Sequence, residues 1–305
     1  MMMSKETYHI PVLLNNCIEG LNIIPNGTYV DLTFGGGGHS KEILKHLNQE
    51  GRLIAFDQDK DALKNIPDDK RLLFIPQNFR FIKNYLRLNG ITKVDGILGD
   101  LGVSSHQFDS GERGFSLRFD GPLDMRMNQD AKLSAEEIIN GYDEPQLTKL
   151  FKEYGELNQA KKIAQTICRN RNEKKIETTK DLVKCVQGLY PKREEHKFLA
   201  KLFQAIRLEV NDEIGALKKC LTDCVDILKV GGRLVIVSYH SLEDRLVKNL
   251  MKTGNVEGVV NKDPIYGNSN VPFRLVVGKP ILPDETELEI NTRSRSAKLR
   301  IAEKI

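Results

Sequence analysis

A run of glycines follows the first segment of the chain that has the residue types of a β-strand. Residues 29–34 are mostly apolar and end at four glycines, 35–38, after which His39 and Ser40 begin a helical pattern. Glycines let the backbone turn sharply and approach a ligand without Cβ clashes, and amides at a helix start point toward such a ligand. Strand, glycine loop and helix together are typical of the opening unit of a nucleotide-binding α/β sheet, although a glycine-rich surface turn is an alternative.

The next apolar run ends in an acid that could hold a ribose. Residues 52–57 read RLIAFD, so Asp57 lies 19 residues after Gly38. That spacing accommodates one helix, one turn and one strand, and an acid at the end of the second strand can accept hydrogen bonds from a ribose diol. Asp57 could instead cap a helix, but Asp59 is available for that capping role. We therefore favour the ribose-binding interpretation.

Two further strands continue the alternation of strand and helix. Residues 71–76 precede Phe79, whose ring could cover an adenine face or begin the core of a helix over 80–88. Residues 94–99 form the fourth predicted strand and lead into Asp100. Ligands of open parallel sheets bind at the carboxyl ends of the strands. The predicted ligand edge therefore carries Asp31, Asp57, Phe79 and Asp100.

Composition restricts the class of protein. The 305 residues are 40% hydrophobic, which suits one domain with an insertion. The longest apolar runs have the length of strands, so no membrane span is predicted, and the N-terminal residues lack the apolar core of a signal peptide. The five cysteines lack zinc-site spacing, so we expect no metal site. We expect a reduced, cytoplasmic environment.

Positive charge gathers in the middle of the chain. The net charge of the whole chain is +4, yet residues 149–207 carry fifteen basic against seven acidic side chains. This segment predicts a polyanionic partner, with a solvated helical face as the alternative. Lys161, Lys162, Lys174 and Lys175 are the lysines that we expect to bind it.

Residues 106–130 show no clean period and predict a long loop, which in a compact chain is usually functional or disordered. Cationic and aromatic residues alternate in it, which suits a single-stranded nucleic acid with an unstacked base. Alternatively, the phenylalanines anchor the loop to the core. These residues are Arg113, Phe115, Arg118, Phe119 and Arg126.

A helical insertion follows this loop. Ser134 and Glu137 form a capping box, and the glycines at 231–232 indicate the end of one long helix over 198–228. The strand pattern then returns. The predicted helices are 134–140, 144–153, 159–171, 179–186 and 198–228, and the predicted later strands are 233–238, 271–278 and 296–303.

Several blocks of sequence, in order, resemble those of a known family. VDLTFGGGGHS, IAFDQD, GILGDLGVSSHQFD, FDGPLDMRM, GGRLVIVSYHSLEDR and RSRSAKLRIAE are similar to blocks of the RsmH (MraW) family of S-adenosylmethionine-dependent 16S rRNA cytosine-N4 methyltransferases. The resemblance implies an α/β fold, with a class I methyltransferase Rossmann-like sheet and an inserted helical substrate-recognition domain. The implied boundaries are 1–105 and 206–305 for the sheet domain and 106–205 for the insertion.

The resemblance also implies a cofactor, a substrate and a setting. S-adenosylmethionine would bind at Gly37, Gly38, His39, Asp57, Phe79, Asp100 and Gln107. Family members often carry a basic residue where this chain has Gly36. The substrate would be a specific cytidine in the decoding (P-site) region of 16S rRNA, in the small ribosomal subunit. A homodimer is a further expectation.

Methylation of an amine requires a group that accepts its proton. Asp100, at the end of the fourth strand, is the expected acceptor, with Ser104, His240 and Asp124 as alternatives. Many amino-methyltransferases have an Asp/Asn-Pro-Pro-aromatic segment at this point, whereas this chain has DLGVSS over 100–105. A nicotinamide-dependent oxidoreductase and a non-catalytic RNA-binding factor are the competing functional hypotheses.

Overall fold

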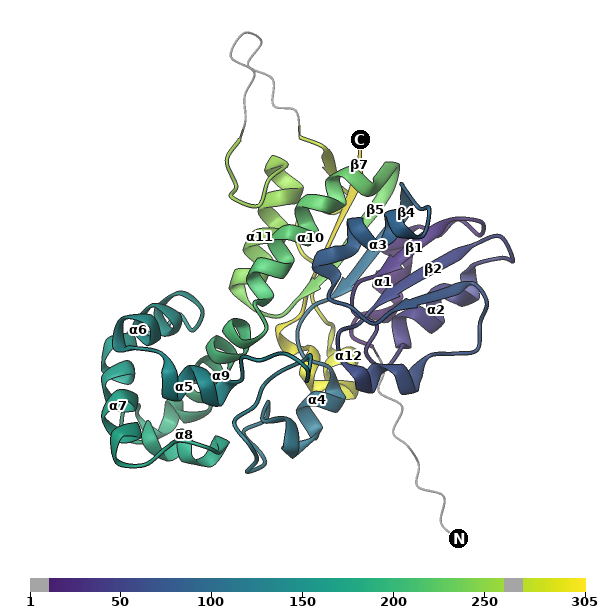
Figure 1. Cartoon of the computed structure of the whole chain (residues 1–305). Coiled ribbons are helices and arrows are strands. Elements are labelled where there is room, and N and C mark those ends of the chain that lie inside the picture. Colours follow the sequence, from purple (N-terminus) through teal and green to yellow (C-terminus); the bar gives the residue numbers. More distant parts are fainter. Residues whose placement is uncertain (1–10, 261–270) are drawn as a thin grey trace. The chain divides into compact units, whose positions relative to one another are not determined.

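The computed structural model describes residues 11–260 and 271–305 and divides into two compact units (Figure 1). The sheet unit comprises Met1–Gly102 and Gly215–Ile305, and the helical unit comprises Val103–Ile214. The second division falls at 214/215 rather than at the predicted 205/206. Helix α9 (Glu195–Val210) runs through position 205 without a break, which explains the difference.

Seven strands form one sheet in the order β3-β2-β1-β4-β5-β7-β6, and β7 pairs antiparallel to both of its neighbours. This confirms the predicted α/β class and the interruption of the sheet after its fourth strand. The strands are β1 (Thr28–Asp31), β2 (Arg52–Phe56), β3 (Leu72–Ile75), β4 (Val94–Asp100), β5 (Leu228–Ser238), β6 (Phe273–Leu275) and β7 (Lys298–Lys304).

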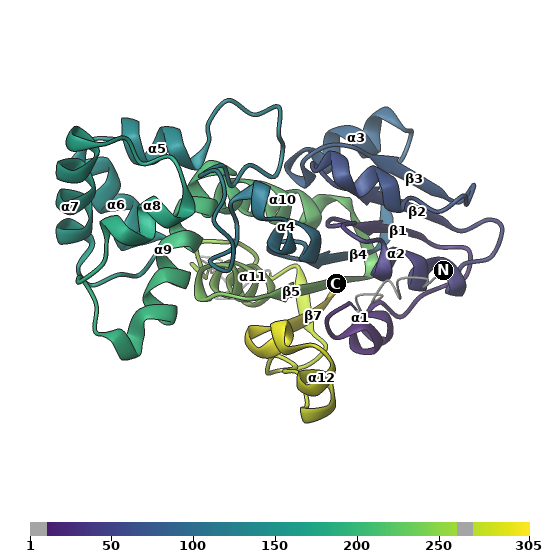
Figure 2. The same cartoon turned by 90° about the horizontal axis from the view of Figure 1, so that it is seen from below.

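Helices cover both faces of this sheet. Helices α1 (Leu14–Leu21) and α2 (Gly38–His46) pack on one face, and α3 (Ile82–Leu88) and α10 (Glu213–Ile227) lie on the other (Figure 2). Helices α11 (Ser241–Thr253) and α12 (Glu285–Ile290) follow β5 and β6 in the chain. The buried core of the first face includes Cys17, Leu21, Tyr29, Ile43, Leu98, Val235 and Leu299.

The helical unit has a core of its own. Its helices are α4 (Ser105–Asp109), α5 (Ala135–Gly141), α6 (Glu144–Glu153), α7 (Ala160–Glu173), α8 (Thr179–Cys185) and α9. Ser134 caps α5 in the predicted capping box. Residues buried between these helices include Ile138, Leu147, Phe151, Ile163, Ile167, Leu182, Leu202 and Ile206.

The prediction of a single long helix over 198–228 is wrong, because Asn211 and Asp212 interrupt the helix between α9 and α10. Asp212 has the left-handed φ of 44°. The Asn211 amide donates to the Met125 carbonyl and its oxygen accepts from the Met127 amide, at 2.8 and 2.7 Å. Amphipathic periodicity continues across the break, whereas these long-range bonds cannot be read from the sequence.

The predicted helix end at Leu228 lies one residue beyond the end of α10 at Ile227, but the glycines at 231–232 do not cap that helix. Strand β5 begins at Leu228, five residues earlier than expected, and Gly231 lies inside it with a φ of 81°. The pairing register with β4 shifts between Val94 and Gly96. The glycines therefore mark an irregularity of the strand rather than a helix cap.

The loop predicted over 106–130 is ordered by its own packing. It contains α4 and a 3₁₀ turn, Gly111–Arg113. Arg113 is buried and donates to the carbonyls of Arg126 and Met127, at 2.9 and 3.2 Å. Phe115 is buried in the core of the helical unit, so for this residue the anchoring alternative holds. Phe119 remains 46% exposed.

Candidate functional site

Asp31 fixes the start of the glycine loop. Its side chain is buried, and it accepts hydrogen bonds from the Thr33 amide at 3.0 Å and the Ser40 hydroxyl at 2.6 Å. These bonds tie the end of β1 to the first turn of α2. Burial raises the pKa of the Asp31 carboxyl, and the two donors oppose that shift. Asp31 therefore supports the loop.

The glycine loop has a left-handed φ at Gly35 and Gly37 and close neighbours at Gly37 and Gly38. Gly37 has a φ of 76°, and a Cβ there would lie 2.8 Å from Cζ of Phe34. A Cβ on Gly38 would lie 2.2 Å from Cγ of Pro11, whereas one on Gly36 would have no described heavy atom within 4 Å. The loop is thus closely packed at Gly37 and Gly38 and open at Gly36, where a side chain has room.

Asp57 ties the second strand to the same loop. One carboxylate oxygen accepts from the Gly35 amide at 2.7 Å and the other from the Asp59 amide at 2.8 Å. Burial raises the pKa of Asp57 to about 6. Asp59 caps the following 3₁₀ turn through the Asp61 amide, which confirms its predicted role. Each oxygen of Asp57 has a further lone pair with which to accept from a hydroxyl.

Phe79 follows β3 and begins a 3₁₀ turn, Phe79–Phe81. The Asn78 side chain accepts from the Arg80 amide at 2.9 Å, and its own amide donates to the Gln58 side chain at 2.9 Å. That second bond joins the ends of β3 and β2. The Phe79 ring is partly exposed and so is available to a flat ligand.

Asp100 lies between two strand ends. Its backbone amide donates to the Thr33 hydroxyl at 2.7 Å, and its carboxylate accepts from the Tyr239 hydroxyl, also at 2.7 Å. The carboxylate is 23% exposed. Burial raises the pKa of Asp100 to about 7, although the Tyr239 hydrogen bond lowers it. At neutral pH this group can therefore both accept and release a proton.

His39 lies beside Asp100 as a neutral imidazole. Burial lowers its pKa to about 4. Its Nε2 lies 3.2 Å from the Val12 carbonyl, which accepts only if that nitrogen carries the proton. Nδ1 is then an acceptor, and it lies 3.9 Å from a carboxylate oxygen of Asp100. We assign this tautomer from the Val12 contact.

The structure adds Tyr239, which the sequence prediction omitted. Tyr239 directly follows β5, and β5 pairs with β4 through Asp100. Desolvation and the Asp100 charge raise the pKa of the phenol, so Tyr239 remains a hydrogen-bond donor. Its position after a strand was a usable signal, but the pairing of β5 with β4 was required to connect it to Asp100.

His240 caps helix α11. Its Nδ1 accepts from the Glu243 amide at 3.4 Å, and its Nε2 lies 3.0 Å from the Glu243 carboxylate. The same carboxylate accepts from the Tyr239 amide at 3.0 Å. The imidazole is thus engaged in starting a helix.

Ser104 and Gln107 belong to the helical unit, where they form a capping box at the start of α4. The Ser104 hydroxyl accepts from the Gln107 amide at 3.2 Å, and the Gln107 side-chain oxygen accepts from the Ser104 amide at 3.1 Å.

Asp124 accepts two hydrogen bonds from the Arg126 guanidinium, at 2.9 and 2.6 Å. That pairing outweighs burial and holds the pKa of Asp124 below its usual range, so Asp124 is a poor proton acceptor.

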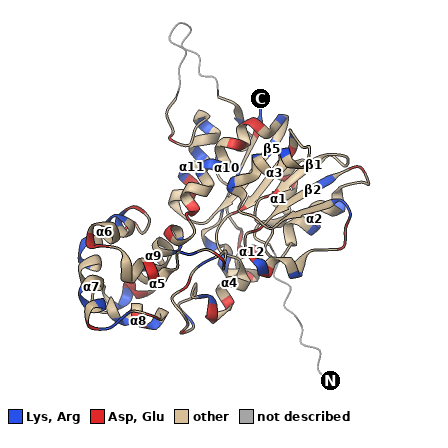
Figure 3. Ribbon diagram, in the orientation of Figure 1, with Lys and Arg blue, Asp and Glu red and all other residues tan. Residues whose placement is uncertain are grey.

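The predicted lysines divide into two kinds. Lys174 lies 3.6 Å from the Asp181 carboxylate, and Lys175 lies 2.5 Å from the Glu136 carboxylate. Lys161 and Lys162 are exposed on α7. Figure 3 shows the basic residues along α7 and α8 of the helical unit. The charge of this segment is therefore partly neutralised at Lys174 and Lys175.

Within residues 11–260 and 271–305, no group of three or more His, Cys, Asp or Glu could hold a metal ion. No helix of that part of the chain is long and apolar enough to cross a membrane.

Known proteins match this chain over its whole length. Residues 6–305 match the model of the MraW methylase family. Two relatives are named "Ribosomal RNA small subunit methyltransferase H". The one from Bacteroides thetaiotaomicron is 56% identical over 298 residues, covering 98% of each chain. The one from Christiangramia forsetii is 56% identical over 304 residues, covering 100% of each.

Solved structures give a weaker likeness. An rRNA methylase from Streptococcus thermophilus has a TM-score of 0.40 at 13% identity, covering 96% of this chain and 93% of its own. NSun6 from Pyrococcus horikoshii, solved with SFG, has a TM-score of 0.44 at 13% identity, covering 100% of this chain and 56% of its own.

The match of residues 6–305 and the relatives at 56% identity agree with the resemblance drawn from the motifs. They support the predicted class of S-adenosylmethionine-dependent methyltransferases. This chain belongs to the MraW methylase family.

Proposed function

We propose that this chain transfers a methyl group from S-adenosylmethionine to the exocyclic N4 of a specific cytidine in the decoding (P-site) region of 16S rRNA. The observation that carries the proposal is the partly buried Asp100 carboxylate, which is held by Tyr239 at the sheet edge that also carries the glycine loop. The names of the relatives support a small-subunit RNA as the substrate.

The residues of the loop fit this methyl donor. The loop packs against Phe34 and Pro11 at Gly37 and Gly38, and its backbone is open at Gly36, where a ligand can approach it. Asp57 has lone pairs for the ribose hydroxyls, and Phe79 offers a ring to the adenine. When bound, S-adenosylmethionine supplies an electrophilic methyl group. A contact of Gln107 with it is part of the proposal, on the strength of the family resemblance.

The target amine needs help because its lone pair is delocalised into the cytosine ring. A carboxylate that accepts a hydrogen bond from the amine favours a pyramidal, more nucleophilic nitrogen, and it can take the proton that methylation releases. In this proposal Asp100 has that role. Its pKa of about 7 matches the task at neutral pH. Tyr239 orients the carboxylate, and neutral His39 adds no competing positive charge.

Asp100 is favoured over the other acceptor candidates because it is partly exposed at the sheet edge, whereas the others have structural roles. Ser104 caps α4, and His240 caps α11. Asp124 is paired with Arg126. We propose that Ser104 and His240 act by shaping the chain around the substrate. Replacement of His240 by alanine should therefore lower the free energy of unfolding by about 1 kcal/mol, as expected for a lost helix cap, and leave the rate of methyl transfer by the folded enzyme near the wild-type rate.

The amine must be exposed before it can react, since base pairing in a duplex hides it. We propose that the RNA presents this cytidine unstacked, and that exposed Arg118 and Phe119 of the helical unit contact the RNA.

Methyl transfer from labelled S-adenosylmethionine tests the proposal. Unmodified small subunits and free 16S rRNA are each incubated with the enzyme, and the labelled nucleoside is identified by mass spectrometry. N4-methylated cytidine is expected. A label on carbon 5 of the base, or on another nucleoside, would contradict the assigned chemistry. RNA binding with no transfer to either substrate would favour the non-catalytic RNA-binding factor instead.

A further inference from the structure

Two cavities adjoin each other in the helical unit. One, of about 310 Å³, is lined by the turn between α6 and α7 and by the start of α9. The other, of about 660 Å³, is lined by α7 and by the end of α8. Leu189 lines both cavities, so they are neighbours on one surface. We call them the aromatic cavity and the basic cavity.

The basic cavity gathers cations without acids. Lys162, Arg169 and Lys184 line it, and none of the described residues that line it is Asp or Glu. Lys162 and Arg169 lie seven positions apart on α7, so both lie on the same face of that helix. None of the three cations forms an ion pair with another described residue. Three such cations in one concave surface attract phosphate groups.

The paired lysines nearby make this arrangement specific. Lys174 and Lys175 lie close to the carboxylates of Asp181 and Glu136, which partly offset their charge. Lys162, Arg169 and Lys184 differ from these two lysines because they form no ion pair with a described residue and line one concave surface together. The sequence alone could not separate the two sets, because the acids come from other helices.

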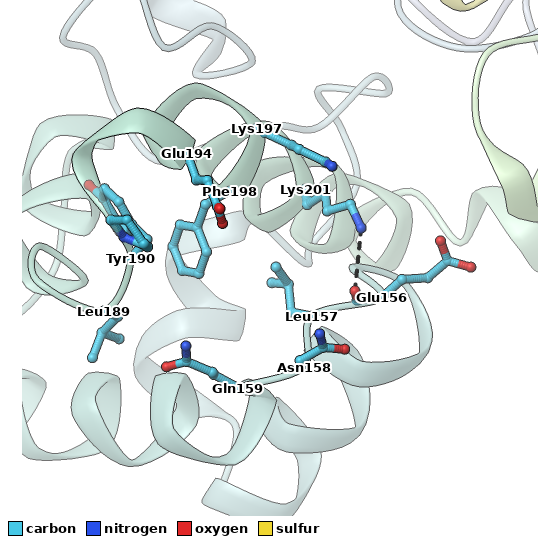
Figure 4. A pocket seen from close by; sticks show the side chains of 11 residues that line it. Glu156, Leu157, Asn158, Gln159, Leu189, Tyr190, Glu194, Lys197, Phe198 and Lys201 are labelled. Carbon is cyan, nitrogen blue, oxygen red and sulfur yellow. Dashed lines mark hydrogen bonds between the residues drawn. The ribbon is translucent and has the colours of Figure 1, made fainter.

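The aromatic cavity suits a flat polar ring. The rings of Tyr190 and Phe198 lie with centroids 4.5 Å apart and planes tilted by 32°. Figure 4 shows Phe198 between Tyr190 and Leu157, and the side-chain amides of Asn158 and Gln159 across the cavity. Aromatic and apolar surface beside amide donors and acceptors is the chemistry that recognises an unstacked nucleobase.

Lysines also reach the aromatic cavity. Lys197 and Lys201 line it from α9, and Lys201 donates to the Glu156 carbonyl at 3.4 Å. Glu156 and Glu194 line the cavity as well, so its charge is balanced. The contrast with the basic cavity indicates different roles, with a neutral base on one side and a charged backbone on the other.

We propose that the two cavities form one docking site for a single-stranded RNA segment. One base occupies the aromatic cavity, and the adjoining phosphates lie on Lys162, Arg169 and Lys184. This inference rests on the proposed function, because the bound RNA is taken to be part of the RNA that the enzyme methylates. A duplex would keep its bases paired and leave the aromatic cavity unused. An acidic protein would use the cations alone, which makes it a distinguishable outcome of the test.

The first test compares two pairs of lysines in the full chain. A Lys162→Ala/Lys184→Ala variant and a Lys174→Ala/Lys175→Ala variant lose the same formal charge. Binding of a labelled single-stranded RNA of mixed sequence is measured by fluorescence anisotropy over a range of salt concentrations. The slope of log affinity against log salt should fall by about 1.4 for the first variant, at about 0.7 for each phosphate contact, and stay near the wild-type slope for the second. Equal slopes for both variants would overturn the proposal.

The second test leaves the protein unchanged. The same RNA with abasic positions keeps its phosphates but offers no base. Its affinity should fall by about 5- to 150-fold, which corresponds to one stacked base, with an unchanged salt slope. Equal affinity of the abasic and intact strands would show that only a polyanion is recognised. That result, together with stronger binding of acidic peptides, would assign the surface to a protein partner.

Methyl transfer separates this inference from the proposed function. The Lys162→Ala/Lys184→Ala variant should show a raised KM for RNA with an unchanged kcat, because these lysines are distant in sequence from the residues proposed to react. Wild-type binding that passes both tests, without methyl transfer to any RNA, would contradict the proposed function and leave the docking site standing. Methyl transfer with an unchanged KM for RNA in that variant would contradict the docking site and leave the proposed function standing.

Discussion

Charged groups at the edge of the sheet unit and on the surface of the helical unit are held in opposite ways. Asp57 accepts hydrogen bonds from the Gly35 and Asp59 amides, and Asp100 accepts one from Tyr239. Lys162, by contrast, is exposed and unpaired among the described residues. The carboxylates are fixed by the fold, whereas the lysine keeps its hydration and its freedom.

Because of this difference, one chain can combine proton transfer with the binding of a polyanion. Burial raises the pKa of Asp57 to about 6 and of Asp100 to about 7, so their protonation states respond to bound groups and to pH. Solvated cations keep their charge and attract a polyanion over a distance that depends on salt. Chemistry is thus expected to fail when the sheet edge is altered, and RNA affinity when the helical surface is altered.

The largest effect should follow from Asp100→Asn. Loss of the proton acceptor should slow single-turnover methyl transfer by about 10²- to 10⁴-fold, with RNA affinity unchanged. Asp95→Asn is the matched control, because Asp95 lies near the other end of β4, where it binds the Thr28 amide and Lys229. A wild-type rate in Asp100→Asn would show that the sheet edge does not supply the proton acceptor.

Asp57→Asn should weaken the binding of S-adenosylmethionine by about 10- to 100-fold, because a charged acceptor of hydrogen bonds is lost. Titration calorimetry measures this affinity. In the wild type, protonation of Asp57 as the pH falls through about 6 should weaken binding in the same direction. Asp61→Asn serves as the control, since Asp61 pairs with the exposed Lys64. Equal affinities for both variants would show that Asp57 supports only the loop.

Tyr239→Phe should shift the pH dependence of the reaction. The Tyr239 hydroxyl lowers the pKa of Asp100, so its removal should move the midpoint of the pH–rate profile upward by about one unit. The rate well above the midpoint should be largely retained. Tyr142→Phe is the control, because that hydroxyl donates to Glu209 in the helical unit at 2.9 Å. A midpoint that does not move, or moves downward, would contradict the positioning role.

The smallest effect concerns the glycine loop. A methyl group on Gly38 would collide with Pro11, so Gly38→Ala should lower the free energy of unfolding by about 1–3 kcal/mol. Gly36→Ala should change it by less than about 0.5 kcal/mol. Denaturant unfolding of both variants makes the comparison. Equal losses would mean that the loop tolerates side chains uniformly.

The sequence predicted the parts of this site that depend on local order. Strand ends located Asp57 and Asp100, and local capping chemistry separated Asp59 from Asp57. The sequence missed Tyr239, because its contact with Asp100 depends on the pairing of β5 with β4 after a long insertion.

Local patterns also misled where distant contacts decide the structure. The amphipathic period continued through Asn211, whose bonds to Met125 and Met127 accompany the helix break. The lysines of the basic segment looked alike until the helices brought acids beside Lys174 and Lys175. Pairing of this kind is a property of packing between helices, and the periodicity of one helix does not contain it.

The pH–rate profile of the wild-type enzyme tests whether Asp100 is the proton acceptor. Single-turnover methyl transfer is measured with saturating S-adenosylmethionine from about pH 5.5 to about pH 9. If Asp100 is the acceptor, the rate rises about tenfold per unit below a midpoint near pH 7 and is level above it. A rate that is constant across this range would contradict the assignment of the chemistry to Asp100.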